Sequence, residues 1–175
     1  MAVAPTSLLH FSEDPDIGRF IPHVPLSNPL QSPAVWSIDP EHAPLYWFPR
    51  DCPRVTAWPH DRARRRHFEA SFTTTALRVH AVELAWLDRV RRTELWCYTF
   101  DPGPFRPWPE ASGQWVADTV IEPIGVEPVG DLLQRHIDAT IELRVVPSLW
   151  PLHEFVQAGD WDFSIVRMAN ARPQR

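Results

Sequence analysis

Apolar residues recur along this chain in short runs, and in most runs apolar and polar positions alternate with a period of two. Such alternation is typical of β-strands, because successive side chains of a strand point to opposite faces of the sheet. The runs predict strands at 7–12, 34–38, 55–58, 79–83, 94–100, 114–121, 124–129, 141–146 and 163–168.

Helices are predicted at fewer places. Asp39-Pro40-Glu41 combines a capping residue, a proline and an acid, which favours a short helix leading into 45–48. Helical spacing also marks 84–92 and 148–156, and Gly130-Asp131 is a plausible helix cap within 129–136. The segment 20–33 holds four prolines and is predicted as an irregular loop of the kind that forms part of a site wall.

Strands outnumber helices and the two do not alternate regularly, so the predicted class is α+β with a mostly antiparallel sheet. A chain of 175 residues is most simply one domain, 1–175, and we expect 1–6 and 170–175 to be frayed.

Composition excludes several kinds of protein. No apolar run approaches the roughly 20 residues that span a bilayer, and the first residues lack a basic signal region, so a cytoplasmic protein with no membrane role is expected. The net charge of −5 gives no electrostatic attraction to nucleic acid. All 17 basic residues are Arg, which rules out lysine Schiff bases and phosphate-loop lysines, and no glycine-rich nucleotide motif is present.

The two cysteines, Cys52 and Cys97, are expected to be free thiols, because no secretion signal places the chain in an oxidising compartment. They are too few for a structural zinc site, and neither a C-x-x-C nor an H-E-x-x-H spacing occurs. No metal is therefore expected.

The stretch 34–58 is the first candidate for a site. It contains a strand, a short helix, and then the loop Pro49-Arg50-Asp51-Cys52-Pro53-Arg54, which gathers arginines, an acid and a thiol. Loops held on rigid elements often carry functional groups. The basic run 60–67 that follows is either a solvated connection or a contact for phosphate or an acidic partner, since Arg binds phosphate oxygens in bidentate fashion.

The order of several motifs carries a resemblance. His10 lies in a first strand, Val35-Trp36-Ser37-Ile38 precedes Tyr46, and later come Leu95-Trp96-Cys97-Tyr98-Thr99-Phe100-Asp101-Pro102-Gly103 and Glu122-Pro123-Ile124-Gly125-Val126. Over about 8–129 this order resembles the ADP-ribosyltransferase superfamily, including the rifamycin-modifying enzymes and the RNA 2′-phosphotransferases. The whole chain also resembles an uncharacterised family of small bacterial proteins, through His10-Phe11-Ser12-Glu13-Asp14 and the 49–54 loop.

The superfamily resemblance implies a split antiparallel sheet with NAD as co-substrate. It places His10 on a ribose hydroxyl, Tyr46 against the nicotinamide, and a carboxylate beside the developing oxocarbenium ion. Glu122 is the preferred carboxylate, with Asp118 and Glu110 as alternatives. Ser12, Arg50 and Arg54 would contact the cofactor, the two arginines through its diphosphate.

These roles require His10 and Tyr46 to line one cleft, and opposite faces of the sheet would speak against a transferase. Phe11 and Ser12 stand where that superfamily usually has Gly-Thr. The acceptor stays open between a protein, a nucleic acid end and a small molecule.

Each proposed role has a packing alternative. His10 and Tyr46 would then be packing residues of an apolar core, and Glu122 would cap the end of a strand. Arg50 would form a structural ion pair with Asp51.

Two other functions remain open. Arg50 and Arg54 flank Cys52 and would favour a thiolate, so a cysteine-dependent hydrolase is one hypothesis, with His10 or His60 as base. The other is a non-catalytic ligand- or partner-binding module on the same fold, with Trp108 and Trp115 at its interface.

Overall fold

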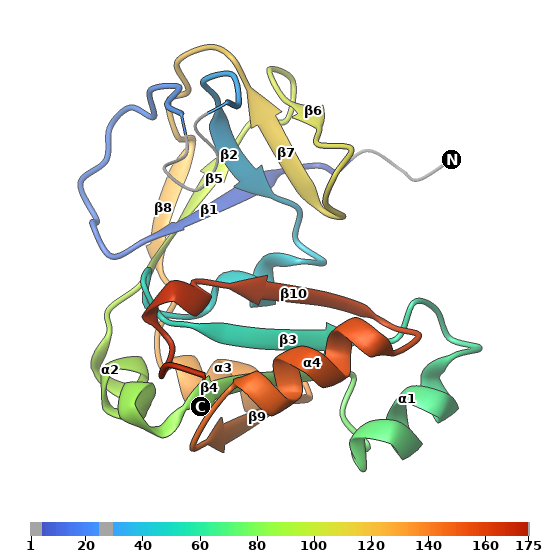
Figure 1. Ribbon diagram of the computed structural model, residues 1–175. Helices are drawn as coiled ribbons and strands as arrows, with labels where there is room; N and C mark the ends of the chain where they lie inside the picture. The colour runs from blue at the N-terminus through green and yellow to red at the C-terminus, as the bar shows by residue number, and fades with distance from the viewer. Residues whose placement is uncertain (1–4, 25–29, 175) are drawn as a thin grey trace. The chain divides into compact units, whose positions relative to one another are not determined.

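The computed structural model describes residues 5–24 and 30–174, and these form two compact units (Figure 1). Unit 1 comes from Met1–Trp47 and Glu94–Val129, and unit 2 from Phe48–Thr93 and Gly130–Arg175. Each unit has its own sheet and its own apolar cluster. Part of the predicted 20–33 loop, residues 25–29, lies outside the described residues, as do 1–4 and 175.

Unit 1 is a six-stranded antiparallel sheet in the order β6-β7-β2-β1-β5-β8. Its strands are β1 (Leu8–Ser12), β2 (Val35–Ile38), β5 (Trp96–Phe100), β6 (Arg106–Pro107), β7 (Gln114–Ala117) and β8 (Gly125–Pro128). The 3₁₀ turn η1 (Ala43–Tyr46) follows β2.

The register of unit 1 assigns its side chains to two faces, because residues paired across antiparallel strands point the same way. His10 pairs with Tyr98, and Leu8 with Phe100, so these four share one face. That face carries the buried cluster of unit 1, which consists of Leu8, Phe20, Val35, Tyr98, Phe100, Phe105, Ala117 and Ile121. Leu9 and its neighbours two residues apart point to the other face.

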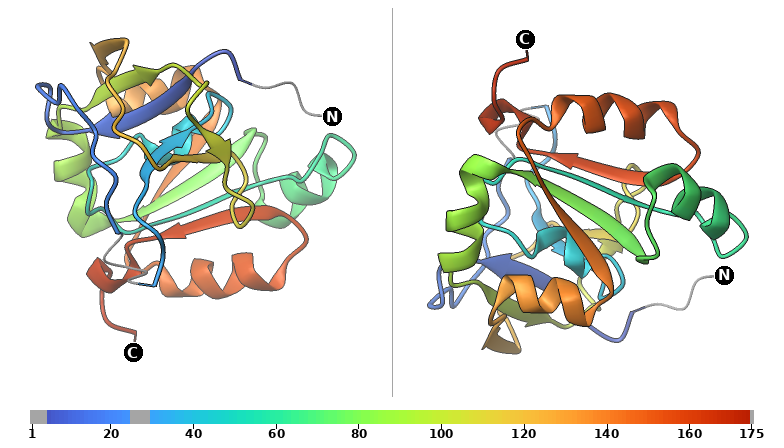
Figure 2. Two further views of the ribbon diagram at one scale, coloured as in Figure 1. Left: turned by 90° about the horizontal axis from the view of Figure 1, so that it is seen from above. Right: turned by 90° about the horizontal axis from the view of Figure 1, so that it is seen from below.

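Unit 2 is a four-stranded sheet in the order β10-β3-β4-β9, antiparallel except for the β4–β9 pair. Its strands are β3 (Arg54–Trp58), β4 (Arg78–Glu83), β9 (Ile141–Val146) and β10 (Asp162–Val166). Its helices are α1 (Arg65–Phe72), α2 (Leu87–Arg92), α3 (Leu132–Asp138) and α4 (Trp150–Ala158), with 3₁₀ turns η2 (Leu84–Trp86) and η3 (Met168–Asn170). Helix α4 runs alongside β10 in both views of Figure 2.

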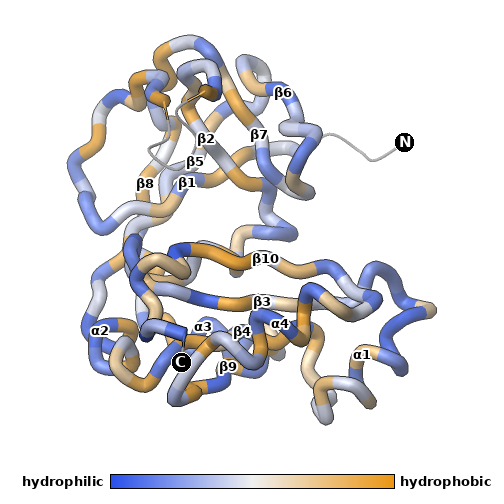
Figure 3. Tube along the Cα trace, in the orientation of Figure 1, coloured by the Kyte–Doolittle hydropathy of each residue, from blue (hydrophilic) through white to orange (hydrophobic). Residues whose placement is uncertain are grey.

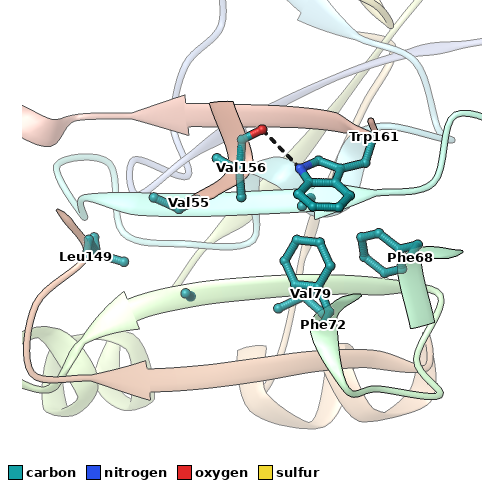
Figure 4. Close-up of a cluster of buried hydrophobic side chains, with 9 residues drawn as sticks. Val55, Phe68, Phe72, Val79, Leu149, Val156 and Trp161 are labelled. Carbon is teal, nitrogen blue, oxygen red and sulfur yellow. Dashed lines mark hydrogen bonds between the residues drawn. The ribbon is translucent and has the colours of Figure 1, made fainter. Parts of the chain in front are cut away.

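The core of unit 2 lies on one face of its sheet (Figure 4). Val55 and Ala57 from β3 and Val79 and Ala81 from β4 meet α1 and α4 there. The Trp161 indole Nε1 donates to the Val156 carbonyl oxygen at 3.0 Å, so the polar atom of this buried ring is satisfied. Figure 3 shows hydrophobic segments along β3 and β10.

The predicted α+β class with mostly antiparallel sheets is confirmed, and each expected strand is present with ends shifted by a few residues. The expected helix after Asp39 is only a 3₁₀ turn, η1, although Asp39 accepts a hydrogen bond from the His42 backbone N–H in the manner of a helix cap. The basic run opens an unpredicted helix, α1, since Phe68 and Phe72 are four residues apart and bury one side of an otherwise charged segment.

Residues 170–174 make several hydrogen bonds within unit 2. Asn170 Nδ2 donates to the Asp51 carbonyl oxygen at 2.8 Å, and the Arg172 carbonyl oxygen accepts from Trp150 Nε1 at 2.6 Å. The Arg172 backbone N–H donates to Glu83 Oε2 at 2.9 Å. The C-terminal segment is therefore held within unit 2 by the backbone of Arg172 and the side chain of Asn170, contacts that local sequence does not reveal.

Candidate functional site

His10 is held in a defined orientation by the strand next to it. Its Nδ1 lies 2.9 Å from the Trp36 carbonyl oxygen, and since a carbonyl only accepts, Nδ1 carries the proton. The ring makes an edge contact with Phe20 at 4.8 Å between centroids and a tilted contact with Phe100 at 6.2 Å. A neutral His10 in this tautomer is an acceptor at Nε2.

Ser12 follows His10 on the same face of β1, as the two-residue period requires. Its Oγ accepts from the Asp14 backbone N–H at 3.1 Å. The Tyr98 hydroxyl donates to the Asp14 carbonyl oxygen at 2.6 Å and accepts from the Ile17 N–H at 3.0 Å. Ser12 and Tyr98 thus fix the loop that leaves β1 beside His10.

Tyr46 contacts a residue from the face of the sheet opposite His10. Its hydroxyl oxygen accepts from Gln114 Nε2 at 3.0 Å. Gln114 pairs with Ile38, and Ile38 pairs with Leu9, so Gln114 belongs to the face opposite His10. The partner of Tyr46 is therefore on the wrong side of the sheet for a joint cleft, and this placement does not support the roles that the resemblance gave to the pair.

Glu122 lies at the surface of unit 1. Its Oε1 accepts from Arg19 Nε at 3.0 Å, with both side chains about two-thirds exposed or more (71% for Arg19 and 66% for Glu122). Exposed ion pairs of this kind contribute little to stability. The residue before it, Ile121, exchanges two backbone hydrogen bonds with Phe20. The alternative acids Asp118 and Glu110 are also exposed.

The 49–54 loop belongs to unit 2. Arg54 is 3% exposed, its Nη1 donates to the Cys52 carbonyl oxygen at 3.1 Å, and its guanidinium stands 5.2 Å from the centre of the Phe48 ring. Arg50 is exposed, and its carbonyl oxygen accepts from Arg167 Nε at 3.4 Å. The guanidinium of Arg54 thus stabilises this loop through its contacts with Cys52 and Phe48. The phosphate contact predicted for Arg50 remains a prediction.

The geometry argues against Cys52 as a nucleophile. The residue is fully buried, and burial raises the pKa of its thiol to about 12 even though Arg54 and Arg89 act in the opposite direction. Its Sγ donates to the Pro53 carbonyl oxygen at 3.6 Å. Reactive cysteines are partly exposed with a lowered pKa, so Cys52 is a packing residue. Both cysteines are free thiols, as predicted.

Two histidine pairs were not anticipated. In unit 1, Asp39 Oδ1 accepts from both the backbone N–H and the Nδ1 of His42, each at 2.8 Å. Burial raises the pKa of the Asp39 carboxyl, but the hydrogen bonds from His42 outweigh it and hold the pKa below its usual value. The Asp-x-x-His spacing in the sequence could have indicated this Asp39–His42 pair. Gly113 packs against this pair, and a Cβ there would lie 2.3 Å from the His42 ring.

The second pair is buried in unit 2. His80 Nδ1 lies 3.1 Å from His136 Nε2, and His136 Nδ1 lies 2.6 Å from the Leu132 carbonyl oxygen. Burial lowers the pKa of both rings, and for His80 the positive charges of Arg78 and Arg54 and the neighbouring His136 add to the effect. The partners are 56 residues apart, so local sequence contains no signal for this pair.

Several other predicted features can be placed. Within the basic run, Arg64 pairs with Asp160 and Arg65 with Glu69, while Arg62 and Arg66 are exposed. The Trp108 ring makes an edge contact with the Trp36 ring, with 5.2 Å between their centroids. In the described part of the chain, no three metal-binding side chains gather, and no helix is both long and apolar enough to cross a membrane.

Comparison with known protein families gives a match over most of the chain. The model of the family of unknown function DUF6886 matches residues 9–171. Neither a curated protein nor a solved structure matches the chain. The expectation of an uncharacterised family is confirmed, and that family carries no assigned activity. Because the match covers nearly the whole chain, this protein belongs to the family of unknown function DUF6886.

Proposed function

We propose that unit 1 binds a ribose-containing ligand of the NAD type at His10, as a binding module that does not rely on Tyr46 and Glu122 as catalytic partners. The observation that carries the proposal is the orientation of His10, whose Nδ1 is bound to the Trp36 carbonyl oxygen. An imidazole fixed in this way accepts a hydrogen bond at Nε2, and sugar hydroxyls are donors of the matching kind.

The surroundings of His10 also fit a binding role. Phe20 and Phe100 present aromatic rings to it, and Ser12 shares its face of β1. Ligand sites typically combine apolar walls with a few oriented polar groups. The loop beyond Ser12 is held by the Tyr98 hydroxyl, so the wall on that side is preorganised.

ADP-ribosyl transfer, with NAD as co-substrate and an acceptor yet to be found, is the second candidate. The order of the sequence motifs favours it, as does the position of His10 in the first strand with Ser12 two residues later. An ADP-ribosyltransferase-like split sheet would be its scaffold. Against it stand the partner of Tyr46 on the opposite face and the surface ion pair of Glu122.

Calorimetric titration with NAD tests the binding proposal. We expect the unmodified protein to bind NAD and the His10→Ala variant to bind at least about tenfold more weakly, the loss of one to two kcal/mol that removal of a hydrogen-bond partner causes. His23→Ala is the matched control, because His23 is an exposed histidine of the same unit. No binding by the unmodified protein at millimolar NAD would refute the proposal.

Release of nicotinamide separates the two candidates. Binding without nicotinamide release supports the binding module. Release that stops in both His10→Ala and Glu122→Gln would establish cleavage of the nicotinamide glycosidic bond, the step that a transferase requires, since a merely exposed carboxylate would leave the rate unchanged. Mass spectrometry of the products would then distinguish transfer to an acceptor from transfer to water. Thermal unfolding of each variant shows whether it is folded under the assay conditions.

A further inference from the structure

The buried histidine pair of unit 2 forms a directed chain of hydrogen bonds. The Leu132 carbonyl oxygen can only accept, so His136 Nδ1 donates to it across 2.6 Å. A neutral His136 then has an unprotonated Nε2. That atom can only accept, so the Nδ1 of His80, 3.1 Å away, must be the donor.

This direction leaves His80 Nε2 as an acceptor. His80 is completely buried, and its Nε2 has no hydrogen-bond partner among the residues that the structure describes. A buried acceptor without a donor destabilises the folded state, and native proteins commonly satisfy such atoms with ordered water. His80 therefore marks a place for a small hydrogen-bond donor.

The sheet supplies a second partner. Thr56 on β3 pairs directly with His80 on β4, so the two side chains leave the same face with Cβ atoms about 5 Å apart. Thr56 is buried, and its Oγ1 donates to the Ser164 carbonyl oxygen at 3.2 Å. The hydroxyl oxygen keeps its own capacity to accept.

The charge of the surroundings selects the ligand. Arg78 precedes His80 by two residues on β4, and Arg54 precedes Thr56, the residue paired with His80, by two residues on β3. Both arginines therefore lie on the same face of the sheet as His80. Their positive charges oppose a bound cation. Burial and these charges also lower the pKa of His80, so a neutral imidazole faces the site.

We propose that one ordered water molecule occupies this site and donates one hydrogen bond to His80 Nε2 and the other to Thr56 Oγ1. A water with two such acceptors completes the chain that runs from Thr56 through His80 and His136 to the Leu132 carbonyl oxygen. It joins β3, β4 and α3 through polar contacts, on the face of the sheet opposite the apolar cluster. This inference is independent of the ligand proposed at His10.

Two measurements on the unmodified protein test the water site. Long-range ¹H–¹⁵N correlation spectra should show both His80 and His136 protonated at Nδ1, the less common form of a free imidazole. A crystal structure should show a water within hydrogen-bond distance of His80 Nε2. Protonation of His80 at Nε2, or an empty site, would overturn the proposal.

Variants at Thr56 test the second partner. Thr56→Ser keeps the hydroxyl and should keep the water, whereas Thr56→Val retains the shape and should lose the water. The readout is the exchange cross-peak between water and the His80 ring protons, which should disappear only in Thr56→Val. Persistence of the cross-peak in a folded Thr56→Val protein would refute the assignment.

Discussion

His80 and His136 meet inside unit 2 with 3.1 Å between Nδ1 of one ring and Nε2 of the other. The contact joins β4 to α3, and Phe48 packs against both rings at 5.6 and 5.1 Å between centroids. Both imidazoles are held neutral by burial, so the pair is stable only while neither ring takes up a proton.

This pair predicts a loss of stability in mild acid. As the pH falls through about 6.5, histidines of the unfolded chain take up protons, whereas His80 and His136 in the folded protein do not, because their pKa values are lowered. The unfolded state then binds more protons, and the free energy of unfolding falls by up to about 1.4 kcal/mol per pH unit for each histidine. Urea unfolding at pH 8.0, 6.5 and 5.5 measures this fall in the free energy of unfolding.

The matched control replaces both rings. His80→Val with His136→Leu removes the titrating groups while keeping an apolar interior, so its stability should change less between pH 6.5 and 5.5. His23→Ala, at an exposed histidine, should retain the full dependence. Parallel curves for the double variant and the unmodified protein would show that other groups control the acid response.

Glu83 should contribute to stability through two backbone donors. It is 3% exposed, and its oxygens accept from the Leu149 N–H at 3.2 Å and the Arg172 N–H at 2.9 Å. Glu83→Ala leaves both donors without this acceptor and should lower the free energy of unfolding by about 2–4 kcal/mol. Glu83→Gln, which keeps one acceptor oxygen, should lose less, and Glu110→Ala is the exposed control. Equal losses in both Glu83 variants would contradict the account.

Gly113 and Gly130 form a matched pair of substitution sites. Both have positive φ, +76° and +82°, so alanine costs about 1–2 kcal/mol at either position from backbone strain. At Gly113 a Cβ would also lie 2.3 Å from the His42 ring, whereas at Gly130 no atom of the described residues, its two chain neighbours aside, would lie within 4 Å of a Cβ. Chemical unfolding should therefore show a larger loss for Gly113→Ala, by more than 1 kcal/mol. A similar loss at both sites would mean that the His42 ring moves freely aside.

Cys52 should react slowly with thiol reagents in the folded protein. Full burial and the raised pKa of about 12 leave almost no accessible thiolate at neutral pH. We expect Cys52 and Cys97 to be modified at rates that rise together when the protein unfolds in urea. A rapid, stoichiometric modification of Cys52 under native conditions, lost in Cys52→Ser, would return the cysteine hydrolase to consideration.

The helices and strands of this protein could be predicted from the sequence wherever a short-range rule applies. The two-residue period placed β1, β4, β5 and β9 to within two residues of their ends, because alternation is a local property of a strand. The capping position of Asp131 marked α3 in the same way, and its Oδ1 accepts from the Leu133 and Gln134 N–H groups.

Contacts between elements that are distant in the sequence became clear only from the tertiary structure. His10 and Tyr46 are each where the sequence predicted an element, but the partners of those elements are set by strand register, in which a shift of one residue exchanges the two faces. The parallel pairing of β4 with β9 and the contact of His80 with His136 bring together residues more than fifty positions apart. Such contacts depend on packing of the whole unit, because no local preference of the chain distinguishes one distant partner from another.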